Sequence, residues 1–241
     1  MEKIIYGLWR DAGVDRAGFN ARLREVVAPE LATLAHAVRL NLQDETVASS
    51  RSPRIVSTSP QIEAVIQVWV DSAREVTRKP LDAAIRKVAP RFAAWLVAEA
   101  TEIPNTAHPP RPGARTEGFA QVVFLGRPPR LTWPAWRELW QDGHTRIAIE
   151  TQANFEYVQN LVIRSLTYGA PDYAAIVEEC FPPEAMFDEA VYFDAQGAPE
   201  RLKANQAAMD ESCARFIDFD RTDCIPTSQF EFKPLPLART R

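Results

Sequence analysis

The sequence is poor in glycine, with nine glycines against nineteen prolines in 241 residues. The glycines never form the G-x-G-x-x-G or G-x-x-x-x-G-K loops that hold nucleotide phosphates. A nucleotide-dependent reaction of either familiar kind is therefore not expected.

Cysteine and histidine are also scarce, with three residues of each. Cys180, Cys213 and Cys224 show no C-x-x-C spacing, so we expect reduced thiols, as in a cytoplasmic protein. The histidines show no H-E-x-x-H or comparable spacing, and the aspartates of 218–223 lack the central glycine and the closing glutamate of a calcium loop. The sequence therefore predicts no dedicated metal site.

An excess of positive charge is absent, and so are long apolar runs. The net charge of −4 and the pI of about 5.5 argue against a nucleic-acid or anionic-membrane partner, and no RNP-like run occurs. The apolar run near the N-terminus is too short for a signal peptide, and nothing elsewhere approaches a membrane span. With 46% hydrophobic and 25% charged residues, the composition is that of an ordinary soluble globular protein.

A proline-rich segment, residues 104–118, divides the chain into halves of about equal length. Residues 4–23 align without a gap on residues 121–140, an offset of 117, and their apolar positions coincide, as where Leu8 falls on Leu125. We therefore predict two tandem repeats. The predicted organisation is a first repeat (1–103), the linker (104–118), a second repeat (119–233) and a C-terminal tail (234–241).

Each half predicts the same order of elements, β-α-β-β-α-β. In the first half we expect strand 4–9, helix 16–34, strands 37–43 and 62–70, helix 81–88 and strand 93–103. In the second half we expect strand 119–125, helix 133–151, strands 155–166 and 173–181, helix 200–216 and strand 229–233. Thr132 is a suitable N-cap for helix 133–151, with Pro134 in its first turn. This order is the α+β, ferredoxin-like arrangement, in which both helices cover one face of an antiparallel sheet.

Four segments of the second half have the order and spacing of a known family. They are Arg127–His144 (RPPRLTWPAWRELWQDGH), Tyr157–Asn160 (YVQN), Pro171–Glu179 (PDYAAIVEE) and Glu211–Asp218 (ESCARFID). They resemble the EthD-like members of the dimeric α/β-barrel superfamily over about residues 119–233, whereas the first half matches only in layout. The resemblance implies that two ferredoxin-like sheets pack face to face as an intramolecular barrel, with pockets between each sheet and its helices.

The resemblance also implies a class of ligand, since the superfamily acts on small, mostly apolar molecules. It includes cofactor-free monooxygenases of polycyclic substrates, cyclases, decarboxylases and haem-using enzymes. Because one fold serves so many reactions, the chemistry must be argued from the site itself.

Trp136, Trp140 and His144 stand four residues apart on the predicted helix 133–151. Each step of four residues turns by about 40°, so the three side chains share one face. Two tryptophans beside an imidazole describe an apolar pocket in which burial favours the neutral histidine, and this form suits a general base. The first-half counterparts are Phe19, Leu23 and Val27. The missing histidine there predicts one working site per chain; the alternative is an ordinary core with His144 as a helix cap.

Two further residues are candidates for the same pocket. Tyr157 and Asn160 lie three apart on a strand and point to opposite faces, and we expect Tyr157 to be the polar group that meets the ligand. Arg127 is a candidate substrate contact, although its recurrence as Arg10 favours a structural role. The adjacent Glu178–Glu179 pair diverges across its strand and cannot act as two close carboxylates.

These features predict a small-molecule enzyme, either an oxidoreductase of the monooxygenase kind or a proton-transfer catalyst such as a decarboxylase or cyclase. His144 would be the base and Tyr157 its hydrogen-bonding partner, with an apolar aromatic or polyketide-like substrate against Trp136, Trp140 and Arg127. No cofactor is required by this scheme. The alternative is a non-catalytic stress-response module that holds an apolar ligand or haem. A homodimer agrees with the family's habit of associating through these sheets, but two tandem sheets could meet that need within one chain.

Overall fold

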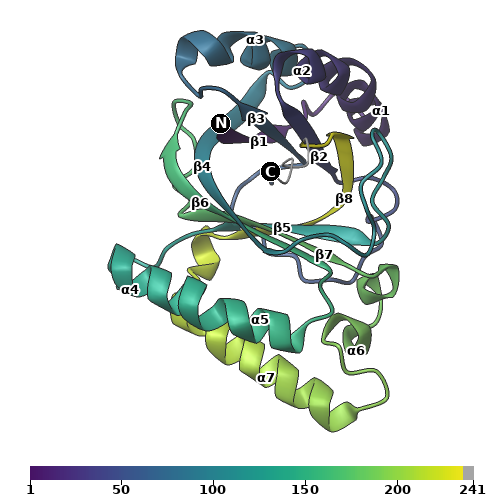
Figure 1. The fold of residues 1–241 in the computed structure, drawn as a ribbon, viewed down its shortest axis with the longest axis vertical. Coiled ribbons are helices and arrows are strands. Elements are labelled where there is room, and N and C mark those ends of the chain that lie inside the picture. Colours follow the sequence, from purple (N-terminus) through teal and green to yellow (C-terminus); the bar gives the residue numbers. More distant parts are fainter. Residues whose placement is uncertain (236–241) are drawn as a thin grey trace, which may run out of the picture.

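The computed structural model describes residues 1–235, which form an α+β unit around a closed antiparallel barrel (Figure 1). The strands are β1 (Glu2–Trp9), β2 (Ala37–Leu42), β3 (Ala64–Val70), β4 (Arg91–Ile103), β5 (Phe119–Leu125), β6 (Glu156–Ser165), β7 (Ala175–Phe181) and β8 (Asp223–Lys233). The predicted α+β class is confirmed. Of the predicted tail 234–241, residues 236–241 lie outside the described part of the chain.

Apart from the short α6, which the sequence did not predict, the helices interrupt this strand order as predicted. They are α1 (Arg16–Arg22), α2 (Ala28–Leu34), α3 (Glu75–Arg86), α4 (Trp133–Arg137), α5 (Thr145–Thr151), α6 (Glu189–Tyr192) and α7 (Pro199–Phe216). The π-helical segments η1 (Leu23–Val27) and η2 (Glu138–His144) join α1 to α2 and α4 to α5, so the two helices expected at 16–34 and 133–151 are continuous. Thr132 caps the second of them, accepting a hydrogen bond from the backbone N–H of Ala135.

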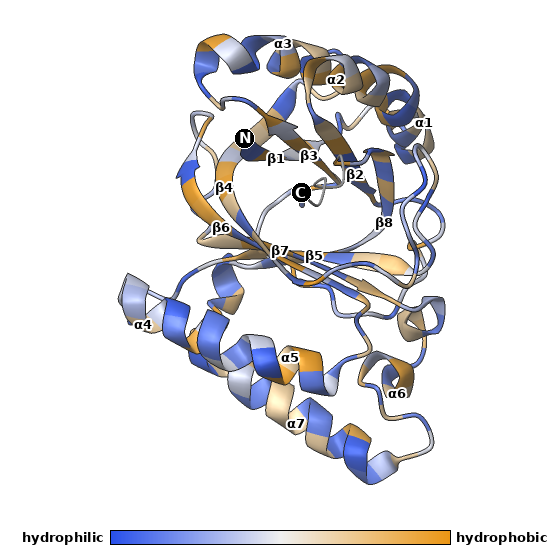
Figure 2. Ribbon diagram, in the orientation of Figure 1, coloured by the Kyte–Doolittle hydropathy of each residue, from blue (hydrophilic) through white to orange (hydrophobic). Residues whose placement is uncertain are grey.

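The barrel runs in the order β1-β3-β2-β8-β5-β7-β6-β4 and closes between β4 and β1. Strands β1–β4 therefore form one sheet and β5–β8 another, joined by the pairing of β2 with β8 and of β4 with β6. Helices α1–α3 cover the outer face of the first sheet, and α4, α5 and α7 cover that of the second (Figure 1). Hydrophobic and hydrophilic residues alternate along α5 and α7, as in helices with one buried face (Figure 2).

Alternation along the strands sends every second side chain into the barrel interior. One part of the interior is apolar and contains Trp95, Phe124 and Tyr173. Another part is polar and centres on the guanidinium of Arg39. It forms ion pairs at N–O distances of 2.7–2.9 Å with Glu156, Glu178 and Glu231. Burial opposes the ionisation of Glu178, but Arg39 and several hydrogen bonds outweigh it and hold the pKa of this carboxyl at about 2.

Most strands differ from their predicted bounds by one or two residues, whereas two elements begin six residues earlier than predicted, and a proline explains each of these two. Helix α3 begins at Glu75 rather than residue 81, because Pro80 lies within the helix instead of ahead of it. Strand β8 begins at Asp223 rather than residue 229. Pro226 lies in the part of β8 that pairs with β5 but not yet with β2, so its missing N–H breaks no hydrogen bond between β8 and β2. Within residues 1–235, no helix is both long and apolar enough to cross a membrane.

Candidate active site between the second sheet and its helices

A cavity of about 360 Å³ lies on the outer face of the second sheet, beneath η2 and α7. We call it the His144 cavity. Its apolar wall includes Val123, Leu125, Trp140, Val177, Met209 and Phe216. Its polar groups include Gln121, His144, Tyr157, Glu179, Cys213 and Cys224. An apolar hollow of this size with a few convergent polar groups is typical of a small-molecule site.

The structure brings three of the five predicted site residues together, since Trp140, His144 and Tyr157 all line this cavity. Trp136 lies fully buried behind Trp140, with ring centroids 4.8 Å apart, and its Nε1 donates to a backbone oxygen 2.9 Å away. Arg127 lies in a separate hollow and donates to the backbone oxygen of Leu131. Arg10 donates in the same way to the backbone oxygen of Val14 in the first half, so the hydrogen bond of Arg127 is one that stabilises a turn in both halves.

His144 is the last residue of η2 and is 8% exposed. Its Nδ1 lies 2.9 Å from Oγ of Ser212 on α7, and its ring lies 4.7 Å from that of Phe216. Burial lowers the pKa of His144 to about 4, so the imidazole is neutral at physiological pH. Within residues 1–235, Nε2 has no protein hydrogen-bond partner, which leaves it for a group in the cavity.

Tyr157 points from β6 to the same side of the sheet as the cavity, whereas Asn160 bonds to the backbone of β7, as its opposite orientation predicts. The Tyr157 hydroxyl accepts a hydrogen bond of 3.1 Å from Nε2 of Gln159. Burial is the main reason that the pKa of Tyr157 is raised above its ordinary value. The phenol therefore keeps its proton and can donate it in a hydrogen bond to a ligand.

Glu179 is a polar cavity group that the sequence does not single out, because it is half of the Glu178–Glu179 pair. As predicted for that pair, the two side chains point to opposite faces, Glu178 to the barrel interior and Glu179 to the cavity. Burial raises the pKa of Glu179 to about 7, in spite of a 3.1 Å hydrogen bond from Asn154 to its Oε1. The carboxyl therefore titrates near neutral pH.

The strand registers show that a carboxyl at the position of Glu179 occurs only in the second of the two sheets within residues 1–235. Glu179 on β7 is paired with Tyr157 on β6 and with Gln121 on β5. The positions with the same register across β2, β3 and β1 are Val38, Val68 and Ile4. A row of three polar side chains thus stands where the first sheet has three aliphatic ones. Extending the internal sequence alignment as far as Val68 would have drawn attention to Glu179.

A hydrogen-bonded chain closes one end of the cavity. Gln152 donates to the hydroxyl of Tyr192 at 3.0 Å, and Tyr192 donates to Oε1 of Gln121 at 2.8 Å. Nε2 of Gln121 in turn lies 2.7 Å from Sγ of Cys224. The chain fixes the Gln121 amide, whereas Oε1 of the buried Gln152 has no partner within residues 1–235.

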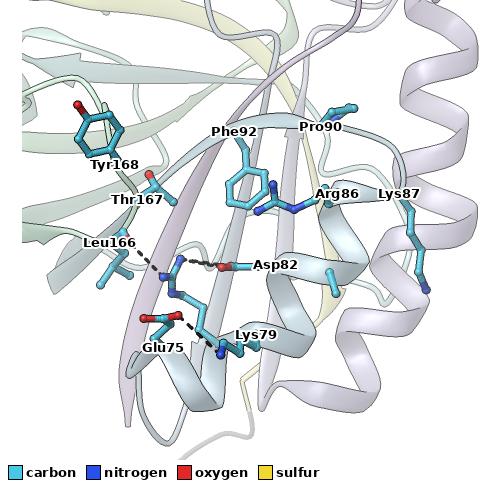
Figure 3. A pocket seen from close by; sticks show the side chains of 12 residues that line it. Glu75, Lys79, Asp82, Arg86, Lys87, Pro90, Phe92, Leu166, Thr167 and Tyr168 are labelled. Atoms are coloured by element: carbon cyan, nitrogen blue, oxygen red, sulfur yellow. Dashed lines mark hydrogen bonds and ion pairs between the residues drawn. The ribbon is translucent and has the colours of Figure 1, made fainter.

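A wider groove of about 900 Å³ lies between α3 of the first half and the segment 166–168 of the second (Figure 3). Its charges are largely engaged with one another. Arg78 pairs with Asp82 at 2.9 Å and donates to the backbone oxygen of Leu166, while Lys79 and Glu75 face each other at 3.8 Å (Figure 3). The groove is more open to solvent than the His144 cavity and offers no counterpart of the buried His144, so the His144 cavity is the stronger candidate site.

The cavity lining also bears on metal and haem. Within residues 1–235, no group of three or more His, Cys, Asp or Glu residues could hold a metal ion. Nε2 of His144 could ligate a haem iron, but among these residues the cavity has no Lys or Arg to pair with the propionates, and it presents Glu179 and Asp210 instead. The residues present do not fit haem.

Solved structures resemble the whole chain. No protein-family model and no curated protein matches it. An anthrone oxidase-like protein superposes with a TM-score of 0.55 at 8% identity, covering 99% of this chain and 96% of its own. A proposed monooxygenase from Fusobacterium nucleatum superposes with a TM-score of 0.50 at 8% identity, covering 96% of this chain and 92% of its own. At this identity the likeness shows the fold alone.

Proposed function

We propose that this chain is an oxidoreductase of the monooxygenase type that oxidises an apolar, aromatic compound in the His144 cavity. The substrate would carry an acidic C–H or O–H, as anthrones and phenols do. Its rings would lie against Trp140 and Phe216, with Tyr157 and His144 contacting its oxygen-bearing edge. The cavity volume of about 360 Å³ suits a compound of a few fused rings.

The row of polar residues across the second sheet carries this proposal. A cavity that only stored an apolar ligand would gain nothing from a buried carboxyl and phenol, since burying polar groups without partners costs free energy. The first sheet, with Val68 in the place of Glu179, shows that the barrel needs neither group. A costly polar row that folding does not require is the signature of a reactive site.

Deprotonation is the step that these residues suit. Losing the proton leaves an electron pair on the substrate, in the electron-rich form that reacts with dioxygen. When a methylene between two aromatic rings becomes a ketone, one oxygen atom enters the product and the other leaves as water with the two hydrogens. The substrate supplies all the electrons, so no further reductant is needed.

The EthD-like relationship of the second half and the tandem-repeat origin of the two sheets belong to the same proposal. They are supported by the four sequence segments given above and by the matching strand order of the halves. The π-helical segments add to this support, because Leu23–Val27 lies 117 residues before Trp140–His144. Conserving such a rare turn in both halves argues for duplication.

Oxygen uptake with anthrone tests the proposal. The wild-type chain should bind anthrone, seen as a rise in Tm, and should accelerate oxygen consumption above the spontaneous rate. His144→Val, which installs the residue found at the corresponding position of the first half, should reduce the rate by at least tenfold. Binding without any accelerated uptake would instead support the alternative, a non-catalytic binding module, and no binding of anthrones or phenols would refute the assignment of the cavity.

A further inference from the structure

The half-buried Glu179 differs from the buried glutamates Glu156, Glu178 and Glu231 in having no positive partner among residues 1–235. Glu178, its neighbour on β7, has Arg39 at 2.8 Å. The side chains lining the His144 cavity include no Lys or Arg among residues 1–235. An ionised Glu179 is therefore uncompensated by the protein, which is a cost that a structural glutamate avoids.

The carboxyl is nevertheless held in a fixed orientation. Oε1 accepts the hydrogen bond from Asn154, which lies two residues before the start of β6, at 3.1 Å. Oε2 has no protein partner within the described chain and belongs to a cavity-lining side chain. One oxygen thus anchors the group, and the other is available to a ligand.

The groups that face Glu179 across the cavity are neutral near pH 7, apart from an exposed aspartate at its edge. They come from every element around it: Tyr157, His144, Tyr192, Cys213, Cys224 and, at the edge, Asp210. Burial raises the pKa of Cys213 and that of Cys224 to about 12, so both remain thiols. Glu179 is thus the only enclosed group among them that gains and loses its proton near neutral pH.

His144 is poorly suited to accept the proton itself. Its pKa of about 4 makes it a much weaker base than Glu179, whose pKa is about 7. A base near the working pH transfers protons most effectively. The neutral imidazole can still hydrogen-bond through Nε2, and the Tyr157 hydroxyl can donate to an oxygen that gains negative charge.

We propose that Glu179 is the catalytic base of the His144 cavity, with Tyr157 donating to the substrate oxygen and His144 acting as a neutral hydrogen-bonding group. The acidic C–H or O–H bond of the aromatic substrate breaks, its electron pair stays on the substrate, and the proton bonds to Oε2 of Glu179. No electron leaves the substrate in this step. The assignment rests on the proposed function and replaces His144 as the group that takes the proton.

Hydrogen–deuterium exchange at the methylene of anthrone, measured by NMR in D₂O without oxygen, isolates this step from oxidation. The wild-type chain should accelerate exchange, with a rate that rises through about pH 7, because the carboxylate is the reactive form. Glu179→Gln keeps the acceptor for Asn154 and should lower the rate by roughly 100-fold or more, without the pH step. His144→Val should lower the rate, as it lowers oxygen uptake, but should keep the pH step, because Glu179 remains in place.

Glu211→Gln is the matched control, because Glu211 is an exposed carboxyl on α7 whose ion pair within residues 1–235 is with Arg215 at 3.6 Å. It should exchange at the wild-type rate. Anthrone-induced stabilisation of Glu179→Gln shows that this variant is folded and binds. Unchanged exchange in a binding Glu179→Gln variant, or loss of the pH step in His144→Val, would overturn the role of Glu179 but not the proposed function. An absence of both binding and exchange in the wild type would overturn both.

Discussion

Replacing Glu179 by glutamine should stabilise the fold at alkaline pH, whether or not a substrate is known. The pKa of Glu179 rises from the ordinary 4.5 to about 7 on folding, chiefly because the carboxyl is buried. The folded chain therefore holds this proton more tightly than the unfolded chain. The stability of the wild type falls as pH rises from about 4.5 to about 7, and the cost is fully present above pH 7.

The size of the effect follows from the two pKa values. A difference of one pKa unit corresponds to about 1.4 kcal/mol, so the full cost of ionising Glu179 is about 3 kcal/mol. Glu179→Gln avoids this cost. Its gain in unfolding free energy over the wild type should therefore be about 3 kcal/mol larger at pH 8.5 than at pH 4.5, or about 6 to 12 °C in Tm.

Urea unfolding of both proteins at the two pH values measures this quantity directly, and Glu211→Gln is the control for the loss of one negative charge. Comparing the difference between proteins at each pH removes every other titrating group from the result. A gain that is the same at both pH values would refute the reasoning, because it would mean that Glu179 has an ordinary pKa in the folded chain.

Three further substitutions test other parts of the account. Arg39→Met should lower the free energy of unfolding by roughly 3–5 kcal/mol at pH 7, because three buried carboxyls lose their common partner. The loss should shrink towards pH 4 as the carboxyls take up protons, and an equal loss at both pH values in urea unfolding would count against this. Trp136→Phe should lower the free energy of unfolding by about 1 kcal/mol, because it removes the hydrogen bond to a backbone oxygen. Its affinity for anthraquinone, measured by calorimetry, should stay within about threefold of wild type. Arg127→Ala should leave that affinity equally unchanged, and a tenfold loss would instead make it a ligand contact.

The sequence predicts most of the fold because local signals and the alignment of its two halves point to the same elements. Helices 16–34 and 133–151 are found within their expected bounds, and strand 119–125 is found as predicted. The two larger errors lie beside a proline, at Pro80 in α3 and near Pro226 in β8. In both places the neighbouring elements decide whether the missing N–H matters, and a single sequence does not contain that information.

The candidate site was predictable only in part, for a similar reason. His144 and Trp140 follow from helical spacing, and Tyr157 from strand alternation. Glu179 was missed because its neighbour Glu178 has the same side chain, and only the environment separates an ion pair inside the barrel from an uncompensated carboxyl in the cavity. Arg127 shows the converse, since its recurrence in the first half was a correct sign of a structural contact.

The most direct test of the central claim is a crystal structure of the chain with anthraquinone, a stable relative of the anthrones. The account predicts the ligand in the His144 cavity, with its rings against Trp140 and Phe216 and a carbonyl oxygen about 3 Å from the Tyr157 hydroxyl. Anthraquinone bound in the groove beside α3, or excluded from the cavity by collapsed side chains, would contradict it.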